Sequence, residues 1–207
     1  YKVFTTVGEL IFAPNAHPAL WLQIPESFSS RSEWEDNCIF KSHQSGPPLF
    51  IYSNAIDSLQ VIEYDFNWLQ RLGNKREIIL VLDESHTLGI RGKDGSGILS
   101  SLTLPEQVQG VVIGSMGKGL GIPAGVIAGN KYWIDKIWNS PHFGGASPAS
   151  PAYLDTWIQM QDHYKALRTV LFQNLHQFEN LIGAENQVLR SVPEYPVHFS
   201  TKKTLSN

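Results

Sequence analysis

The sequence has one cysteine, Cys38, among its 207 residues. A single cysteine excludes an intrachain disulfide framework and a metal site built from several cysteines, and it is typical of a reducing compartment. Because Cys38 follows a charged stretch, we expect a packed or incidental thiol rather than a nucleophile. No uninterrupted apolar run reaches the roughly 18 residues of a membrane span. We therefore expect a cytoplasmic protein without a membrane partner.

Charged residues are also scarce, at 17% of the sequence, and the net charge is −3. This balance gives no reason to expect nucleic acid or an anionic surface as a partner. The first residues lack the basic and then apolar layout of a signal peptide, and no methionine opens the sequence. We expect a segment of a longer protein.

Buried strands are predicted where apolar residues follow one another without interruption, at residues 49–52, 78–82 and 111–113. Continuous runs are typical of a parallel sheet that is covered on both faces. A further strand is predicted at residues 124–128. With helical segments between the strands, the sequence predicts an α/β fold, a mostly parallel central sheet flanked by helices.

Helices are predicted from the spacing of apolar residues over residues 62–72, 131–138 and 151–182. Gly183 is expected to end the longest of them, whose leucines and aromatic residues are expected to pack in the core. The polar stretch 25–47 is interpreted as a helix start followed by a loop.

Lys118 lies in the segment SMGKGLG, close to Gly117, Gly119 and Gly121. Glycine has no Cβ and tolerates positive φ, so the backbone here can turn tightly and approach a ligand. This is a suitable place for a reactive amine. On this segment alone, a solvated lysine on a glycine-rich loop is an equal alternative.

Two pairs of polar residues follow predicted strands with the same spacing. Asp83 and His86 follow residues 78–82, and Ser115 and Lys118 follow residues 111–113. In α/β sheets ligands gather at the carboxyl ends of strands, so both pairs are expected at one edge. The alternative for Asp83 is a helix or turn cap. His17, in the turn PNAHP, is a further candidate, with a structural or surface histidine as its alternative.

An amine, a carboxylate and an imidazole at neighbouring strand ends suit an aldehyde cofactor that is bound to lysine as a Schiff base. Pyridoxal 5′-phosphate fits best, because the carboxylate would keep its pyridine nitrogen protonated and make the ring an electron sink. No metal is expected.

The segment DESHTLGIRGKDGSG resembles the Asp-x-x-His glycine-rich segment of fold-type I pyridoxal-phosphate enzymes, and SMGKGLGIPAGVIAG resembles the lysine segment of their α-oxoamine synthase subgroup. The resemblance implies Lys118 as the Schiff-base lysine and Asp83 as the partner of the pyridine nitrogen. It implies His86 as a donor to the ring hydroxyl oxygen and Ser115 as a phosphate contact. The turn NAHPAL resembles the family's Asn-His segment, which makes His17 the residue that stacks on the cofactor ring.

The sequence also departs from this family. Glu84 and Ser85 stand where the family usually has a second aspartate and an alanine, and Gly145 stands where it usually has a hydroxyl residue that reaches the phosphate of the neighbouring subunit's cofactor. Ser147 is a candidate substitute. The family's upstream phosphate loop and its downstream arginine, which grips the substrate carboxylate, have no counterparts in these 207 residues.

The resemblance implies a cofactor-binding large domain over residues 1–183, with its N-terminal part missing, and the beginning of a small C-terminal domain over residues 184–207. It implies a homodimer whose substrates are an amino acid and, as a candidate, an acyl-CoA. The expected reaction is a condensation of the 8-amino-7-oxononanoate synthase type. The alternatives are an aminotransferase or lyase, and a fold relative without catalysis.

Overall fold

The structure is a computed structural model that describes residues 3–16, 27–183 and 188–200. At its centre is a five-stranded sheet whose strands lie in the order β1, β2, β5, β6, β7. The first four strands are parallel to one another, and β7 is antiparallel to β6. Their bounds are β1 Glu9–Phe12, β2 Leu49–Asn54, β5 Ile78–Asp83, β6 Val108–Ser115 and β7 Gly125–Gly129. The predicted α/β fold with a mostly parallel sheet is confirmed.

Both faces of the sheet are covered at β2 and β5, as the continuous apolar runs predicted, whereas β7 is largely exposed. Along β5, Leu80 belongs to the core on one face and Val81 to the core on the other. The first core contains Trp34 and Cys38 of α1 (Arg31–Ser42) and residues of the 3-10 helix η3 (Asn67–Arg71). Cys38 is therefore a packed thiol, and burial raises its pKa.

The second core lies against α2 (Lys131–Trp138) and the short 3-10 helix η1 (Phe4–Thr6). Trp133 of α2 meets Phe4 and Phe50 edge to face, with ring centroids 5.7 and 5.0 Å away. Helix α2 has the bounds that the sequence predicted. The polar stretch 25–47 contains the whole of α1, which begins after Ser30, whose side chain accepts a hydrogen bond from the Glu33 N–H.

The predicted helix over residues 62–72 is wrong in its first half. Ile62–Glu63 forms strand β4, which pairs antiparallel with β3 (Ile56–Asp57), and only Asn67–Arg71 is helical. Asp57 explains the difference, because its carboxylate accepts hydrogen bonds from the N–H groups of Leu59 and Gln60. These bonds favour a tight turn between two strands over a helix.

The predicted helix over residues 151–182 consists of two helices, α4 (Pro151–Gln159) and α5 (Gln161–Ile182), which meet at Met160. Gly183 ends α5 with a positive φ, as predicted. The expectation that this segment packs in the core is wrong, because neither helix has a buried residue. The most exposed large apolar side chains of this segment are Leu181, Ile158 and Tyr153.

The remaining elements are small. The short helix α3 (Pro141–Gly144) follows α2, and the 3-10 helices η4 (Lys93–Gly95) and η5 (Leu99–Ser101) lie between β5 and β6. Strands β8 (Leu189–Ser191) and β9 (His198–Ser200) form a separate antiparallel pair, and the division into domains at residue 183 stays a prediction. Among the residues described, no helix combines the length and the apolar character needed to cross a bilayer.

Candidate active site

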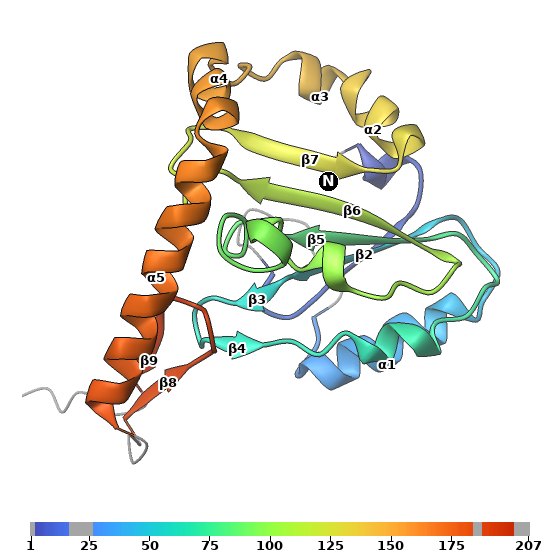
Figure 1. The fold of residues 1–207 in the computed structure, drawn as a ribbon. Coiled ribbons are helices and arrows are strands. Elements are labelled where there is room, and N and C mark those ends of the chain that lie inside the picture. The colour runs from blue at the N-terminus through green and yellow to red at the C-terminus, as the bar shows by residue number, and fades with distance from the viewer. Residues whose placement is uncertain (1–2, 17–26, 184–187, 201–207) are drawn as a thin grey trace, which may run out of the picture.

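The ends of β5 and β6 bring the two predicted pairs of polar residues to one edge of the sheet. The two strands are paired in parallel, with Asp83 beside Ile113. Both arrowheads point toward α5 (Figure 1). Beyond the strand ends, Lys118 Nζ lies 2.6 Å from His86 Nε2. The amine and the imidazole that the sequence singled out are therefore in direct contact.

The glycines around Lys118 permit a close approach between two loops. A Cβ placed on Gly119 would lie 2.4 Å from the backbone oxygen of Leu88, in the loop that follows His86. Gly89, with φ of 82°, would in turn place a Cβ 3.0 Å from the carbonyl carbon of Gly119. Side chains at these positions would push the loops apart. These glycines thus hold Lys118 close to His86.

Asp83 and Ser115 are linked through the residue between them in space, Ser85. The backbone N–H of Ser85 donates to Asp83 Oδ1 at 2.9 Å, and its hydroxyl oxygen accepts from the N–H of Ser115 at 2.9 Å. Ser115 Oγ accepts from the N–H of Gly117 at 3.1 Å. Asp83 is half-buried, and one of its carboxylate oxygens is occupied by this bond. Asp83 can therefore cap the turn through Oδ1 and still offer its second carboxylate oxygen to a ligand.

A cavity of about 700 Å³ opens beside Lys118 and His86. Its walls combine apolar side chains with Tyr164 and Arg168 of α5, and with Tyr195 from the β8–β9 connection. Among the described residues that line it, the charged or ionisable nitrogen groups belong to His86, Lys118 and Arg168, and none is an aspartate or glutamate. The cavity therefore suits a ligand that carries negative charge.

Three further predicted positions give less support to the site. His17 lies outside the described residues, so its stacking role stays a prediction. Gly145 and Ser147 follow α3 and are exposed. Within the described part of the chain, no group of three or more histidine, cysteine, aspartate or glutamate residues could hold a metal ion.

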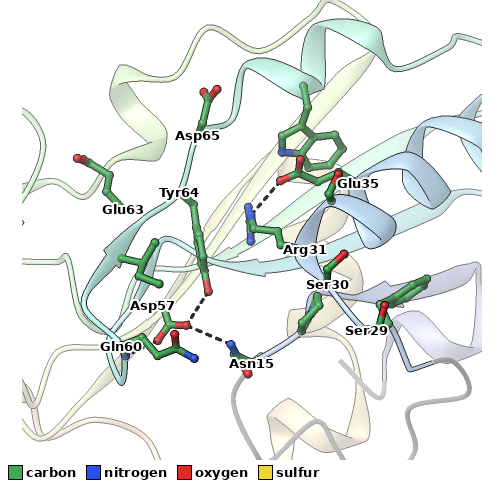
Figure 2. A pocket seen from close by; sticks show the side chains of 15 residues that line it. Asn15, Ser29, Ser30, Arg31, Glu35, Asp57, Gln60, Glu63, Tyr64 and Asp65 are labelled. Carbon is green, nitrogen blue, oxygen red and sulfur yellow. Dashed lines mark hydrogen bonds and ion pairs between the residues drawn. The ribbon is translucent and has the colours of Figure 1, made fainter. Parts of the chain in front are cut away.

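A second cavity, of about 660 Å³, lies between α1 and the β3–β4 hairpin (Figure 2). The Arg31 guanidinium stacks on the ring of Tyr64, 3.6 Å from its centroid, and forms an ion pair with Glu35 at 2.9 Å. Asp57 accepts hydrogen bonds from Asn15 at 3.1 Å and from the Tyr64 hydroxyl at 3.3 Å. Each of these charged groups has a partner within the protein, and Arg31 Nη2 is buried without a hydrogen-bond partner among the described residues.

Sequence reasoning missed several residues of the site. Tyr164 donates to the backbone oxygen of Leu120 at 2.7 Å, next to the Lys118 loop, and Arg168 donates to the backbone oxygen of Asp94. Both lie on α5, and only the docking of α5 across the strand ends reveals them. Glu84 and Ser85 were noticed as departures from a family pattern, and their contacts depend on where the two strands end.

Known proteins resemble this chain in sequence. Residues 65–192 match the family model described as aminotransferase class I and II. The 8-amino-7-oxononanoate synthase of Petrotoga mobilis is 34% identical over 82 residues, which are 39% of this chain and 21% of the relative. Serine palmitoyltransferase 2 of Kluyveromyces lactis is 27% identical over 112 residues, which are 53% of this chain and 20% of the relative.

Solved structures share the fold. A serine palmitoyltransferase from S. paucimobilis with a bound PLP–myriocin aldimine superposes with a TM-score of 0.76 at 14% identity, covering 99% of this chain and 56% of that one. The 8-amino-7-oxononanoate synthase of Francisella tularensis gives a TM-score of 0.65 at 18% identity, covering 92% and 58%. The chain thus spans about half the length of these structures, and its matched segments cover 21% of the Petrotoga mobilis relative and 20% of the Kluyveromyces lactis relative.

Proposed function

The chain belongs to the aminotransferase class I and II family, and on that premise we propose that it holds pyridoxal phosphate through Lys118 in a transferase that acts on an amino acid. The observation that carries the proposal is the 2.6 Å contact between Lys118 Nζ and His86 Nε2 in the wall of a cavity whose described lining residues include no aspartate or glutamate. Relatives named 8-amino-7-oxononanoate synthase and serine palmitoyltransferase favour condensation of the amino acid with an acyl-CoA.

The residues present fit the cofactor. The donor set supplies an amine, an imidazole, and a carboxylate whose Oδ1 is held by Ser85, and the adjoining cavity of about 700 Å³ has basic side chains for a phosphate or carboxylate. Pyridoxal phosphate supplies an aldehyde that condenses with amines and a ring that withdraws electrons from the neighbouring carbon.

Each residue has a proposed task. Lys118 would hold the aldehyde and would accept or return a proton at the substrate Cα. Asp83 keeps the pyridine nitrogen protonated, because a carboxylate stabilises the charge on that nitrogen. His86, whose Nε2 lies 2.6 Å from Lys118 Nζ, would donate to the ring hydroxyl oxygen, and Ser115 would contact the phosphate. His17 stacking on the ring completes the proposed set.

Transamination is the second candidate, because the matching family is described by that activity. A lyase step is a third use of the same cofactor, and a homodimer is the proposed assembly. Incubation of the enzyme with a panel of amino acids and acyl-CoA donors separates the reactions. Release of CoA supports condensation, whereas formation of a keto acid without CoA supports transamination.

The cofactor proposal is tested by absorbance and borohydride trapping of the wild-type protein. We expect an absorbance band near the visible edge, which borohydride removes while fixing the mass of the cofactor on Lys118. Lys118→Ala should show neither the band nor the added mass. Lys131→Ala is the matched control, because Lys131 lies on the surface of α2 in an ion pair with Asp135.

Two results would overturn this assignment. An equal band in Lys118→Ala would place the cofactor on another amine. A wild-type protein that stays colourless in excess pyridoxal phosphate, and gains no resistance to heat from it, would instead favour a fold relative without catalysis.

A further inference from the structure

The two strands that carry the site differ in where they end. Backbone pairing between β5 and β6 reaches Asp83 and Ile113, and the N–H of Glu84 still donates to the Ile113 oxygen at 2.8 Å. Strand β6 continues to Ser115, where the chain of β5 has already turned away. The N–H of Ser115 therefore lies beyond the last backbone hydrogen bond between β6 and the chain of β5.

The hydroxyl of Ser85 replaces the backbone acceptor that β5 no longer provides for the N–H of Ser115. Its oxygen accepts from the N–H of Ser115 at 2.9 Å. A half-buried backbone N–H without an acceptor raises the free energy of the fold. This bond therefore favours the observed path of the chain where it leaves β6. Since Lys118 follows three residues later, the bond holds the base of the lysine loop.

The same residue also holds Asp83. The Ser85 backbone N–H donates to Asp83 Oδ1 at 2.9 Å, while its side chain holds Ser115. The link continues from Ser115 Oγ to the N–H of Gly117, the residue before Lys118. One serine thus joins the carboxylate and the lysine loop, which come from different strands.

We propose that Ser85 is a positioning residue, whose hydroxyl fixes the lysine loop relative to Asp83. The proposal rests on the function proposed above, in which Asp83 and Lys118 bind the two ends of one cofactor ring system. Alanine, which is usual at this place in the family that the segment resembles, cannot make this bond. The placement of Lys118 here therefore depends on a side chain rather than on backbone pairing alone.

The fold of the loop itself has other support. Glu84 is fully buried, and its carboxylate accepts hydrogen bonds from the Leu99 N–H at 2.8 Å and from the Thr87 hydroxyl. Neither of these bonds involves Ser85 or Ser115. Removing the Ser85 hydroxyl is thus expected to loosen the exit of β6 without unfolding the loop.

The test compares Ser85→Ala with Ser85→Thr, which keeps a hydroxyl. Ser101→Ala is the control, because it also removes a serine hydroxyl that bonds to backbone, at the Ile98 oxygen, away from Lys118. Two quantities are measured, the amide exchange rate of Ser115 by NMR and the concentration of pyridoxal phosphate at half-saturation. Exchange is followed without the cofactor.

For Ser85→Ala we expect roughly tenfold faster exchange at Ser115 and about a fivefold higher half-saturation concentration, the size expected for one lost hydrogen bond. Ser85→Thr should restore both, and Ser101→Ala should change neither. If Ser85→Ala does not fold, Ser85→Cys carries the test, because sulfur is a weaker acceptor of similar size.

Unchanged exchange at Ser115 in Ser85→Ala overturns the proposal, and so does faster exchange with unchanged cofactor affinity. A wild-type protein that does not attach the cofactor contradicts the proposed function instead. In that case the positioning role toward a cofactor falls with it, while the exchange rates show separately whether Ser85 holds the exit of β6.

Discussion

Glu84 shows how one buried side chain shapes the loop beside the site. Its carboxylate receives the N–H of Leu99, and Gly97 passes so close that an added Cβ would lie 2.7 Å from the carboxyl carbon. Gly97 also has φ of 85°, where other residues are strained. The loop after His86 therefore closes over Glu84 only when residue 97 lacks a side chain.

Gly97→Ala is expected to lower the free energy of unfolding by about 2–3 kcal/mol, from backbone strain and steric overlap with Glu84. Chemical denaturation provides the measurement. Gly144→Ala is the control, because nothing lies within 4 Å of a Cβ at Gly144. Equal stability of the two variants would show that the loop adjusts around a methyl group without cost.

The residues of the site could be predicted from the sequence where the ends of the strands could be predicted. Asp83, His86, Ser115 and Lys118 each follow a continuous apolar run, so their common edge was predicted. The contact between Lys118 and His86 was found only in the structure. The role of Ser85 depends on β6 extending two residues beyond the last residue that pairs with β5. Apolar patterns do not fix strand ends to a single residue, so this bond was not predictable.

At the scale of elements, α2 is a helix whose start and buried face are both visible in the sequence. The Asn130 side chain accepts the N–H of Tyr132 at 2.8 Å, and Trp133 and Ile137 are buried. Helix α2 then covers the sheet face that contains Phe50. The spacing of its apolar residues alone was enough to place it, and the cap at Asn130 is a finding of the structure.

Asn130→Ala should lower the free energy of unfolding by about 1 kcal/mol, because the first turn of α2 loses its capping acceptor. The effect is measured by urea denaturation. Asn74→Ala, at an exposed position in the loop before β5, should change stability by less than half as much. A loss no greater than that of Asn74→Ala would mean that Trp133 packing alone sets the start of α2.

Two elements were predicted wrongly for different physical reasons. The spacing of apolar residues over 62–72 is helical, but the Asp57 carboxylate fixes a turn that directs Ile62–Glu63 into a strand. In α5 the helix is correct, but its apolar face lies exposed among the described residues. Periodicity predicts an element and its apolar face, and it does not identify what covers that face.

At the scale of the whole molecule, Glu9 ties the first strand to two distant segments. It forms ion pairs with Lys41 of α1 and with Arg76, which precedes β5, each at 2.8 Å. Burial acts to raise the pKa of Glu9, but the hydrogen bonds and charges of Lys41 and Arg76 outweigh it and lower the pKa. The ionised carboxylate therefore favours the folded state.

A lowered pKa stabilises the fold above the ordinary pKa of a glutamate, and this contribution is lost as pH falls through the folded value. Wild type should exceed Glu9→Gln in free energy of unfolding by about 1 kcal/mol or less near neutral pH, since the side chain is 35% exposed. The difference should vanish by about pH 3.

Denaturation at several pH values measures this difference, with Glu106→Gln as the control at an exposed position. A gap between wild type and Glu9→Gln that stays constant down to about pH 3 would contradict the assignment, because it could not come from ionisation of Glu9.

The contact between His86 and Lys118 also bears on the order in which the elements assemble during folding. The two residues are 32 positions apart and follow strands that are direct neighbours in the sheet. Closing a loop of this length costs little more chain entropy than closing one half as long. We expect the amine and imidazole to meet as soon as β5 and β6 pair during folding, so that α5 and the β8–β9 pair arrive later and enclose a site already formed.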